Sequence, residues 1–271
     1  MNFKRILTAL IGFPVVAAIF IFGSKYIVDI VVMIIALIGM NEYIKCISKK
    51  VNVISWISYL FIACMALIHI IPAELIQMAL PFVLPVLMLV LFLHVIISDM
   101  KISFEQIAYT LFGILYIFGF LVFIPLVYGF EGEVSGKLLI WFVLFASWGT
   151  DVFAYFIGCK IGKHKFSKVS PKKSIEGCIA GVFGAVILTL IFSYILNNYF
   201  DYSFSYLIMG ISACVLSIIG QIGDFSASVV KRSFDIKDFS ELFPGHGGML
   251  DRIDSVMFIA PFAYLLFMIL F

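Results

Sequence analysis

Charged side chains are concentrated in one short segment near the C-terminus, "KRSFDIKDFSELFPGHGGMLDRID", which runs from Lys231 to Asp254. This segment holds nine charged residues, although the whole chain of 271 residues has only 18 Lys and Arg and 16 Asp and Glu. Carboxylates supply the oxygen ligands that Mg²⁺ prefers, and Lys and Arg neutralise the charge of phosphates. The chemistry that uses both is a metal-assisted reaction of phosphate groups. Asp224 and Asp251 are the natural pair of metal ligands.

A polar stripe leads into this segment. Its members are spaced 4, 3, 4 and 3 residues apart, so they share one face of a helix; they are Ser217, Gln221, Asp224, Ser228 and Lys231. An ionised aspartate facing lipid would cost about 3 kcal/mol or more, so Asp224 should face a wet cavity, a cation or Lys231. The alternative is a hydrogen-bonding stripe between helices, closed by an Asp224–Lys231 pair.

The end of the segment, "FPGHGGMLDRID", combines a Pro/Gly turn at residues 244–248 with a helix start near Met249. The turn lets backbone N–H groups point at one anion, and the helix adds the positive end of its dipole. Asp251 and Asp254 lie on one face of the first turn, where carboxylates are also favoured for purely structural reasons. That structural explanation leaves the neighbouring polar residues unexplained, namely His246, Arg252, Lys231, Arg232, Lys237 and Asp238.

A second basic segment, "CKIGKHKFSKVSPKKSIEG" at residues 159–177, carries six lysines. Its Ser170-Pro171 pair predicts a helix start, which would place Lys172 and Lys173 near a helix N-terminus suited to a triphosphate. The alternative is the excess of basic residues that cytoplasmic loops of membrane proteins carry. That rule does not account for the residues that follow, which are Ser174, Glu176 and Gly177.

Two further acidic residues lie within apolar runs. Asp151, in "SWGTDVFAYFIG", shares a helix face with Tyr155 and Gly158. It is expected to line the reaction cavity, and pairing with a polar group of the core is the alternative. Asp29 lies near the outer end of its run and is expected to snorkel toward the membrane surface.

The composition indicates the elements that hold these residues. Hydrophobic residues make up 63% of the chain and charged residues 13%, and the mean hydropathy is +1.17; a soluble domain carries roughly a quarter charged residues. A net charge of +2 gives no reason to expect a nucleic-acid partner. The fold class predicted is therefore an all-α polytopic integral membrane protein.

Nine segments are apolar enough to be transmembrane helices, because a span needs about 20 residues. They are Ile6–Gly23, Ile27–Ile44, Val53–Ile71, Ala79–Ile97, Ile107–Tyr128, Leu138–Gly158, Cys178–Leu196, Tyr206–Asp224 and Ile253–Phe271.

Basic residues set the orientation. With the N-terminus cytoplasmic and the C-terminus outside, 16 of the 18 Lys and Arg face the cytoplasm, and only Lys25 and Lys137 do not. Residues 1–140 are then an N-terminal transmembrane region of about five spans. Residues 141–271 form the catalytic transmembrane region, with cytoplasmic loops at 159–177 and 225–252.

The stretch from Ser228 to Asp254 resembles the signature of the phosphatidate cytidylyltransferases, also called CDP-diacylglycerol synthases. Gly223-Asp224, the segment "SPKKSIEG" from Ser170 to Gly177, and the residues around Asp151 are also similar to that family. The resemblance begins at about Ser147, and the N-terminal half shares only its hydrophobic spans.

The resemblance implies transfer of CMP from CTP to phosphatidic acid, giving CDP-diacylglycerol and pyrophosphate. It implies Mg²⁺ at Asp224 and Asp251, with a second cation left open. The resemblance also implies catalytic roles for Lys231, Arg232, Lys237, Asp238, His246, Arg252 and Asp254 alongside the two metal ligands. The residues expected to bind substrate are Ser170, Lys172, Lys173, Ser174, Glu176, Ser228, Gly247, Gly248 and Asp151.

The implied partners are CTP, phosphatidic acid and the lipid bilayer, and a homodimer is one oligomeric state that the sequence leaves open. A composition rich in Ile and Phe favours a bacterial inner membrane, with the active site facing the cytoplasm. Two other functions fit the same residues. One is a CTP-dependent polyprenol or dolichol kinase-like enzyme, and the other is an ion or solute transporter with Asp151 and Asp224 along its path.

Overall fold

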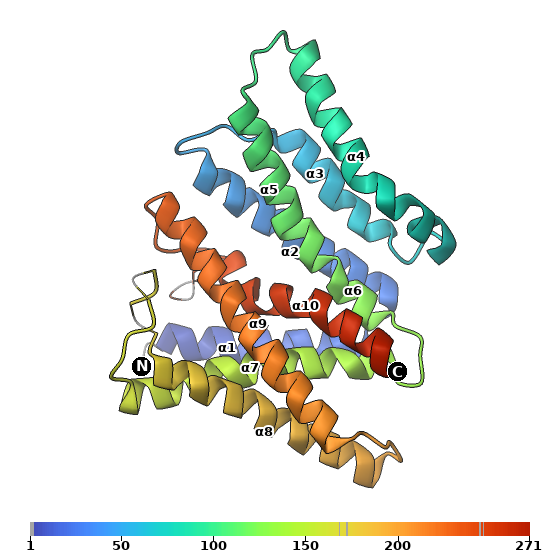
Figure 1. Ribbon diagram of the computed structural model, residues 1–271, viewed down its shortest axis with the longest axis vertical. Helices are drawn as coiled ribbons and strands as arrows, with labels where there is room; N and C mark the ends of the chain where they lie inside the picture. Colours follow the sequence, from blue (N-terminus) through green and yellow to red (C-terminus); the bar gives the residue numbers. More distant parts are fainter. Residues whose placement is uncertain (1–2, 168, 172, 244, 246) are drawn as a thin grey trace. The chain divides into compact units, whose positions relative to one another are not determined.

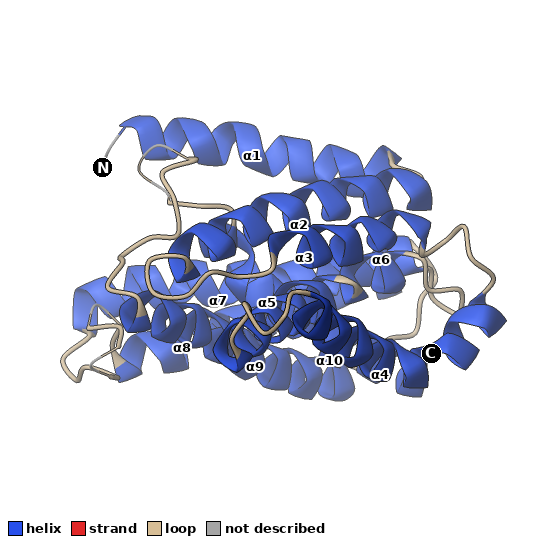
Figure 2. Ribbon diagram, turned by 90° about the horizontal axis from the view of Figure 1, so that it is seen from above, coloured by secondary structure: helices blue, strands red, loops and turns tan. Residues whose placement is uncertain are grey.

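The computed structural model describes residues 3–167, 169–171, 173–243, 245 and 247–271 (Figure 1). Over these residues the chain consists of helices and loops, and the view in Figure 2 shows no strand among them. Two isolated bridges, between Lys165 and Ser174 and between Phe243 and Gly247, are the β-type pairings of the described part. The predicted all-helical class is confirmed.

The described helices, in chain order, are α1 (Phe3–Phe22), α2 (Lys25–Ile47), α3 (Ser55–Ala63), the 3₁₀ helix η1 (Cys64–Leu67), α4 (Ala73–Ile97), α5 (Phe104–Leu121), α6 (Phe123–Tyr128), α7 (Gly136–Ile161), α8 (Ile175–Tyr199), α9 (Tyr206–Ser233) and α10 (Leu250–Leu270).

Within the described part of the chain, six helical segments are long and apolar enough to cross a membrane: Lys25–Ile47, Phe104–Tyr128, Gly136–Ile161, Ile175–Tyr199, Tyr206–Ser233 and Leu250–Leu270. Three shorter apolar segments, Gly12–Phe22, Ser55–Leu67 and Pro81–Ile97, fall within the other predicted spans. The third predicted span is a nine-residue α-helix followed by four residues of 3₁₀ helix, about 20 Å in all, against a hydrocarbon core of about 30 Å. The count of nine spans and the orientation of the termini stay predictions.

The helices form two compact units. The first contains α1 to α6 together with the segment Phe234–Leu250, and the second contains α7, α8, α9 and α10 from Asp251 onward. The functional division drawn from the sequence at residue 140 stays a prediction.

In the first unit α2 packs against α3, α5 and α6 (Figure 1). Tyr43 of α2 is fully buried, and its hydroxyl donates to the backbone oxygen of Tyr109 at 2.8 Å. Gly113 of α5 faces this ring, since a Cβ there would lie 2.4 Å from it. The glycine lets α5 approach α2, and the hydrogen bond satisfies the one polar atom that the aromatic side chain buries.

Asp29 does not snorkel as predicted. It is fully buried on the packed face of α2, one turn from Val32, and its Oδ1 lies 2.7 Å from Nδ1 of His69. The sequence prediction was wrong because it considered only the depth of Asp29 in the membrane. The helix register turns the carboxylate inward, where a partner is required.

In the second unit α7 and α8 lie side by side and α9 packs against both (Figure 1). Small residues allow α7 and α8 to approach each other closely. A Cβ on Gly158 would lie 3.3 Å from Cα of Gly177, and one on Gly181 would lie 2.9 Å from the backbone oxygen of Thr150. Such contacts are how helices associate tightly when lipid removes the hydrophobic driving force between them.

Glycines also bring α9 against α10. A Cβ on Gly223 would lie 2.5 Å from the backbone oxygen of Asp254, and one on Gly220 would lie 2.8 Å from the side chain of Ile259. The close approach at Gly223 matters for the predicted site, because the next residue on α9 is Asp224, one of the predicted site residues.

Candidate active site

Lys173 and Asp224 form the first ion pair of the site, in which Nζ of Lys173 donates to Oδ2 of Asp224. Lys173 comes from the loop before α8 and Asp224 from α9. The side chains of Lys173 and Asp224 are 27% and 24% exposed, so both reach solvent. Asp224 thus pairs with Lys173, whereas Lys231, its predicted alternative partner, pairs with Asp251; that Asp224 binds a metal cation stays a prediction.

Charged and aromatic side chains surround Lys173. Burial lowers the pKa of its ammonium group, and the nearby carboxylates of Asp151 and Asp254 oppose that shift by favouring the charged form. The ammonium also lies 4.6 Å from the ring centroid of Phe225, a cation–π contact. These neighbours thus offset part of the cost of burying the ammonium group of Lys173.

The loop that carries Lys173 is held by its own hydrogen bonds. Phe166 N donates to the backbone oxygen of Lys173 at 3.0 Å, and Ile175 N donates to that of His164 at 2.9 Å. Oγ of Ser174 accepts from Gly177 N at 3.1 Å and caps α8, which begins at Ile175. The helix start predicted at Ser170-Pro171 is therefore wrong, because the cap that forms is the next serine along.

Lys231 and Asp251 form the second ion pair, with Nζ and Oδ1 2.5 Å apart. Their side chains are only 9% and 4% exposed. Lys231 is in the last turn of α9 and Asp251 in the first turn of α10. Desolvated charges of this kind are stable only as a pair, so each residue fixes the position of the other.

Two more carboxylates belong to the same unit. Asp254 is buried and interacts electrostatically with Asp151, Lys231 and Lys173. Asp151 also interacts with the positive charge of Arg252. The two ion pairs and these residues make one group, which we call the polar cluster: Asp151, Lys173, Asp224, Lys231, Asp251, Arg252 and Asp254.

A polar cavity of about 550 Å³ opens beside this cluster. Asp151, Lys173 and Ser174 line it, together with Tyr155 and Gly158. Asp151 therefore lines a cavity, together with the two residues predicted to share its helix face; that this is the reaction cavity stays a prediction. The cavity is large enough for part of a nucleotide, and sites of a few hundred Å³ are typical for small ligands.

The rest of the predicted stripe on α9 bonds to neighbouring helices. Oγ of Ser217 lies 2.6 Å from Oγ1 of Thr150 on α7, and Nε2 of Gln221 donates to the backbone oxygen of Cys178 on α8 at 3.2 Å. Ser228 is buried. The helical spacing predicted the inward face correctly, and the interhelical alternative is correct for Ser217 and Gln221.

Several of the predicted site residues do not belong to the polar cluster. Glu176 bonds His164, with Oε1 and Nδ1 2.6 Å apart, and so ties the loop to α8. Ser170 is half-buried in that loop, and Arg232, on α9, is exposed. Lys172 and His246 lie outside the described residues.

The glycine turn and its neighbours belong to the first unit. Lys237 and Asp238 are exposed there. Gly245 and Gly247 have φ of 81° and 83°, a conformation that side chains disfavour, and Phe243 N donates to the backbone oxygen of Gly247 at 2.9 Å. The tight turn predicted from the glycines is confirmed over the described residues.

Glu42 is a residue that sequence reasoning missed. It is buried on α2, and its carboxylate accepts hydrogen bonds from Ser240 Oγ at 2.6 Å, Met249 N at 2.8 Å and Leu250 N at 2.9 Å. A Cβ on Gly248 would lie 2.6 Å from Oε1 of Glu42. Glu42 therefore caps the start of α10 from another helix and holds the backbone just before Asp251. Its signal in the sequence is a lone glutamate inside an apolar run.

No group of three or more His, Cys, Asp and Glu side chains that could hold a metal ion occurs among the described residues. The arrangement instead offers carboxylates on two helices that meet at Gly223 and Asp254. The polar cluster contains four aspartates and three basic side chains.

The chain is similar to known proteins over nearly its whole length. The model of the cytidylyltransferase family matches residues 3–270. A phosphatidate cytidylyltransferase of Staphylococcus aureus strain COL is 32% identical over 269 residues, which cover 95% of each chain. That of Thermotoga maritima is 36% identical over 175 residues, 64% of this chain and 63% of that protein. That of Bacillus subtilis is 39% identical over 132 residues, 48% of each.

Proposed function

Because this chain belongs to the cytidylyltransferase family, we propose that it transfers CMP from CTP to phosphatidic acid, giving CDP-diacylglycerol and pyrophosphate. Its full-length similarity to the Staphylococcus aureus phosphatidate cytidylyltransferase supports this substrate pair. The observation that carries the proposal is the polar cluster, in which the ion pairs Lys173–Asp224 and Lys231–Asp251 lie in one unit of apolar helices.

In the proposed reaction, a phosphate oxygen of phosphatidic acid forms a bond to the α-phosphorus of CTP. The bond between that phosphorus and the oxygen bridging to the β-phosphorus breaks, and pyrophosphate leaves with the electron pair. The attacking oxygen is largely ionised near pH 7, because the second pKa of a phosphate monoester is about 6. No side chain has to remove a proton, so the demand on the protein is to position and neutralise phosphates.

Lys173, Lys231 and Arg252 provide the positive charge for this task. Lys173 lines the polar cavity and would bind the phosphates of the nucleotide. Lys231 is buried against Asp251 and would hold that carboxylate in place. Exposed Arg232 would add to the positive charge of this unit that attracts CTP.

The donor set fits a Mg²⁺ ion. Aspartate oxygens are its preferred protein ligands, and one or two carboxylates suffice when phosphates complete the shell. CTP would bring further negative charge to the polar cluster, so a divalent cation would be needed there. We propose that Asp224 and Asp251 hold it. When bound, it would neutralise the triphosphate and polarise its phosphorus–oxygen bonds.

The proposed membrane arrangement has nine spans, a cytoplasmic N-terminus and catalysis at the cytoplasmic face. It is supported by the 16 Lys and Arg that this orientation places inside. CTP would then reach the polar cluster from the cytoplasm, and the lipid would come from the bilayer.

The proposal is tested with the purified full-length protein in detergent, supplied with CTP, Mg²⁺ and dioleoyl phosphatidate. We expect CDP-diacylglycerol and pyrophosphate to form in equal amounts. Asp224→Asn should reduce the rate by roughly 100-fold or more, because it removes a ligand charge at the reacting phosphates. The wild-type protein yielding no cytidine-containing lipid would refute the proposed function.

A further inference from the structure

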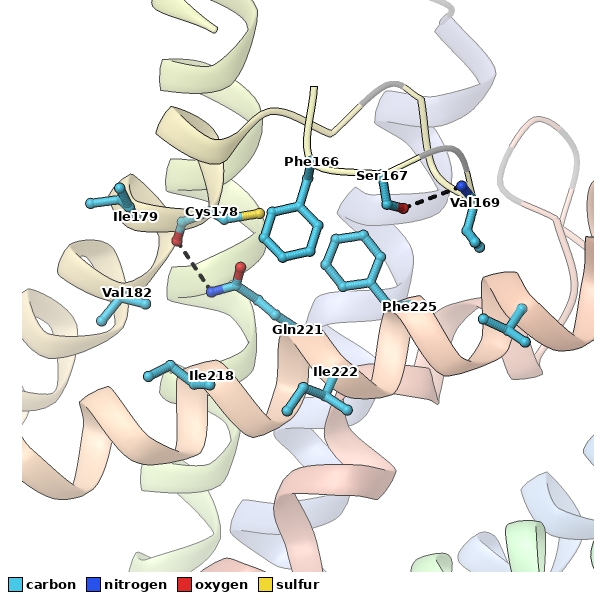
Figure 3. Close-up of a pocket in the computed structure, with 11 residues that line it drawn as sticks. Phe166, Ser167, Val169, Cys178, Ile179, Val182, Ile218, Gln221, Ile222 and Phe225 are labelled. Carbon is cyan, nitrogen blue, oxygen red and sulfur yellow. Dashed lines mark hydrogen bonds between the residues drawn. The ribbon is translucent and has the colours of Figure 1, made fainter. Parts of the chain in front are cut away.

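An apolar groove of about 500 Å³ lies in the second unit, between α8, α9 and the loop before α8 (Figure 3). Ile179 and Val182 line it from α8, and Ile218 and Ile222 line it from α9. The rings of Phe166 and Phe225, which also line it, are stacked with their centroids 4.6 Å apart. Its lining is almost wholly hydrocarbon, as suits an aliphatic ligand.

The groove lies next to the polar cavity. Cys178 and Gln221 line both, and the amide of Gln221 is bonded to the backbone oxygen of Cys178. That bond satisfies a polar donor that hydrocarbon could not. The end of a ligand lying in the groove could therefore lie close to the polar cavity.

A positive charge stands at this junction. The ammonium of Lys173 lies over the ring of Phe225, a residue of the groove, and is paired with Asp224, the residue before it. The junction therefore suits a ligand with an apolar body and an anionic head.

The groove is also open to the side. Ile179, Ile218 and Ile222 remain 54%, 48% and 54% exposed, and they belong to two helices long enough to span a membrane. A hydrocarbon chain can thus enter laterally from the bilayer without crossing a polar barrier.

We propose that this groove holds one acyl chain of the lipid substrate, with the headgroup phosphate reaching the polar cavity at Lys173. The inference rests on the proposed function and adds to it the place of the lipid. The groove follows α9 from Ile218 to Val229, about 16 Å at 1.5 Å per residue. The remainder of the chain would stay in the bilayer.

The first test is photolabelling of the unmodified protein in phosphatidylcholine nanodiscs. The probe is a phosphatidate with a diazirine in the middle of one acyl chain. We expect labelled peptides from residues 175–185 and 215–225, and competition by dioleoyl phosphatidate but not by added phosphatidylcholine of the same chains. Labelling that both lipids suppress equally, or that falls on other helices, would overturn the inference.

The second test fills the groove with Ile222→Trp and uses Ile211→Trp as the matched control. Ile211 is an exposed isoleucine of the same helix and lines neither cavity. We expect Ile222→Trp to raise the KM for dioleoyl phosphatidate about tenfold, with the KM for CTP unchanged. Equal KM values for both variants would contradict the inference.

A failure of the proposed function can be distinguished from a failure of the acyl-chain site. A wild-type protein that forms no CDP-diacylglycerol counts against the proposed function. An active wild-type protein whose groove is not labelled by the probe counts against the acyl-chain site alone.

Discussion

Lys231 and Asp251 join the end of α9 to the start of α10 through a buried ion pair, with Nζ and Oδ1 2.5 Å apart. The pair therefore serves the fold and the proposed chemistry at once, and these two roles can be separated.

Lys231→Met should lower the free energy of unfolding by about 3–5 kcal/mol, because it leaves Asp251 charged and uncompensated in a buried position. Thermal unfolding in detergent measures this. The double variant Lys231→Met, Asp251→Leu should recover most of the stability, since it removes both charges, but should remain inactive. Cytidylyl transfer by the double variant would show that the pair is structural only.

Lys173→Met should raise the KM for CTP about tenfold, because it removes a positive charge from the polar cavity. Lys163→Met is the control, since Lys163 is an exposed lysine of the same loop that does not line the cavity. Steady-state kinetics with CTP varied will compare the two. If both variants raise KM equally, the loop acts only through its overall charge.

The sequence predicted the helices and the inward face of α9 because both depend on local periodicity. Hydropathy identified the six long spans, and the spacing of Ser217, Gln221 and Asp224 identified the face that contacts other helices. The division of the third predicted span into α3 and η1 has no comparable signal, since hydropathy does not distinguish a continuous helix from an interrupted one.

The sequence could not predict which charges pair. Asp224 and Lys231 are seven residues apart on one helix face, but Asp224 bonds Lys173, 51 residues earlier, and Lys231 bonds Asp251. Such pairings depend on how α8, α9 and α10 pack. Glu42 was missed for the same reason, because its partners follow it by about 200 residues along the chain.

Glu42→Ala should reduce kcat, because three donors lose their acceptor and the backbone before Asp251 loses its anchor. Glu42→Gln should retain part of the activity. Its Oε1 can still accept from Ser240 and Met249, which bond that atom in the wild type, while the bond from Leu250 is lost.

The control for Glu42 is Asp29→Asn, which alters another buried carboxylate of α2, bonded to His69. It should lower stability without changing kcat per folded molecule. Equal losses of kcat in Glu42→Ala and Asp29→Asn would mean that Glu42 supports the fold of its unit and does not position the segment before Asp251.

Removing divalent cations with EDTA should abolish turnover, because the carboxylates of the polar cluster and the triphosphate then repel one another. Excess Mg²⁺ should restore it, and an unchanged melting temperature would show that the fold is intact. Turnover that persists in EDTA would exclude Asp224 and Asp251 as ligands of an essential metal.

The most direct test follows the phosphates of CTP. The wild-type protein is incubated with phosphatidate and CTP carrying ³²P at either the α or the γ position, and the lipid is then extracted. The α label should appear in the lipid together with cytidine, and the γ label should appear only in pyrophosphate. Transfer of the γ label to lipid, without cytidine, would contradict the assignment of this chain as a cytidylyltransferase acting on phosphatidic acid.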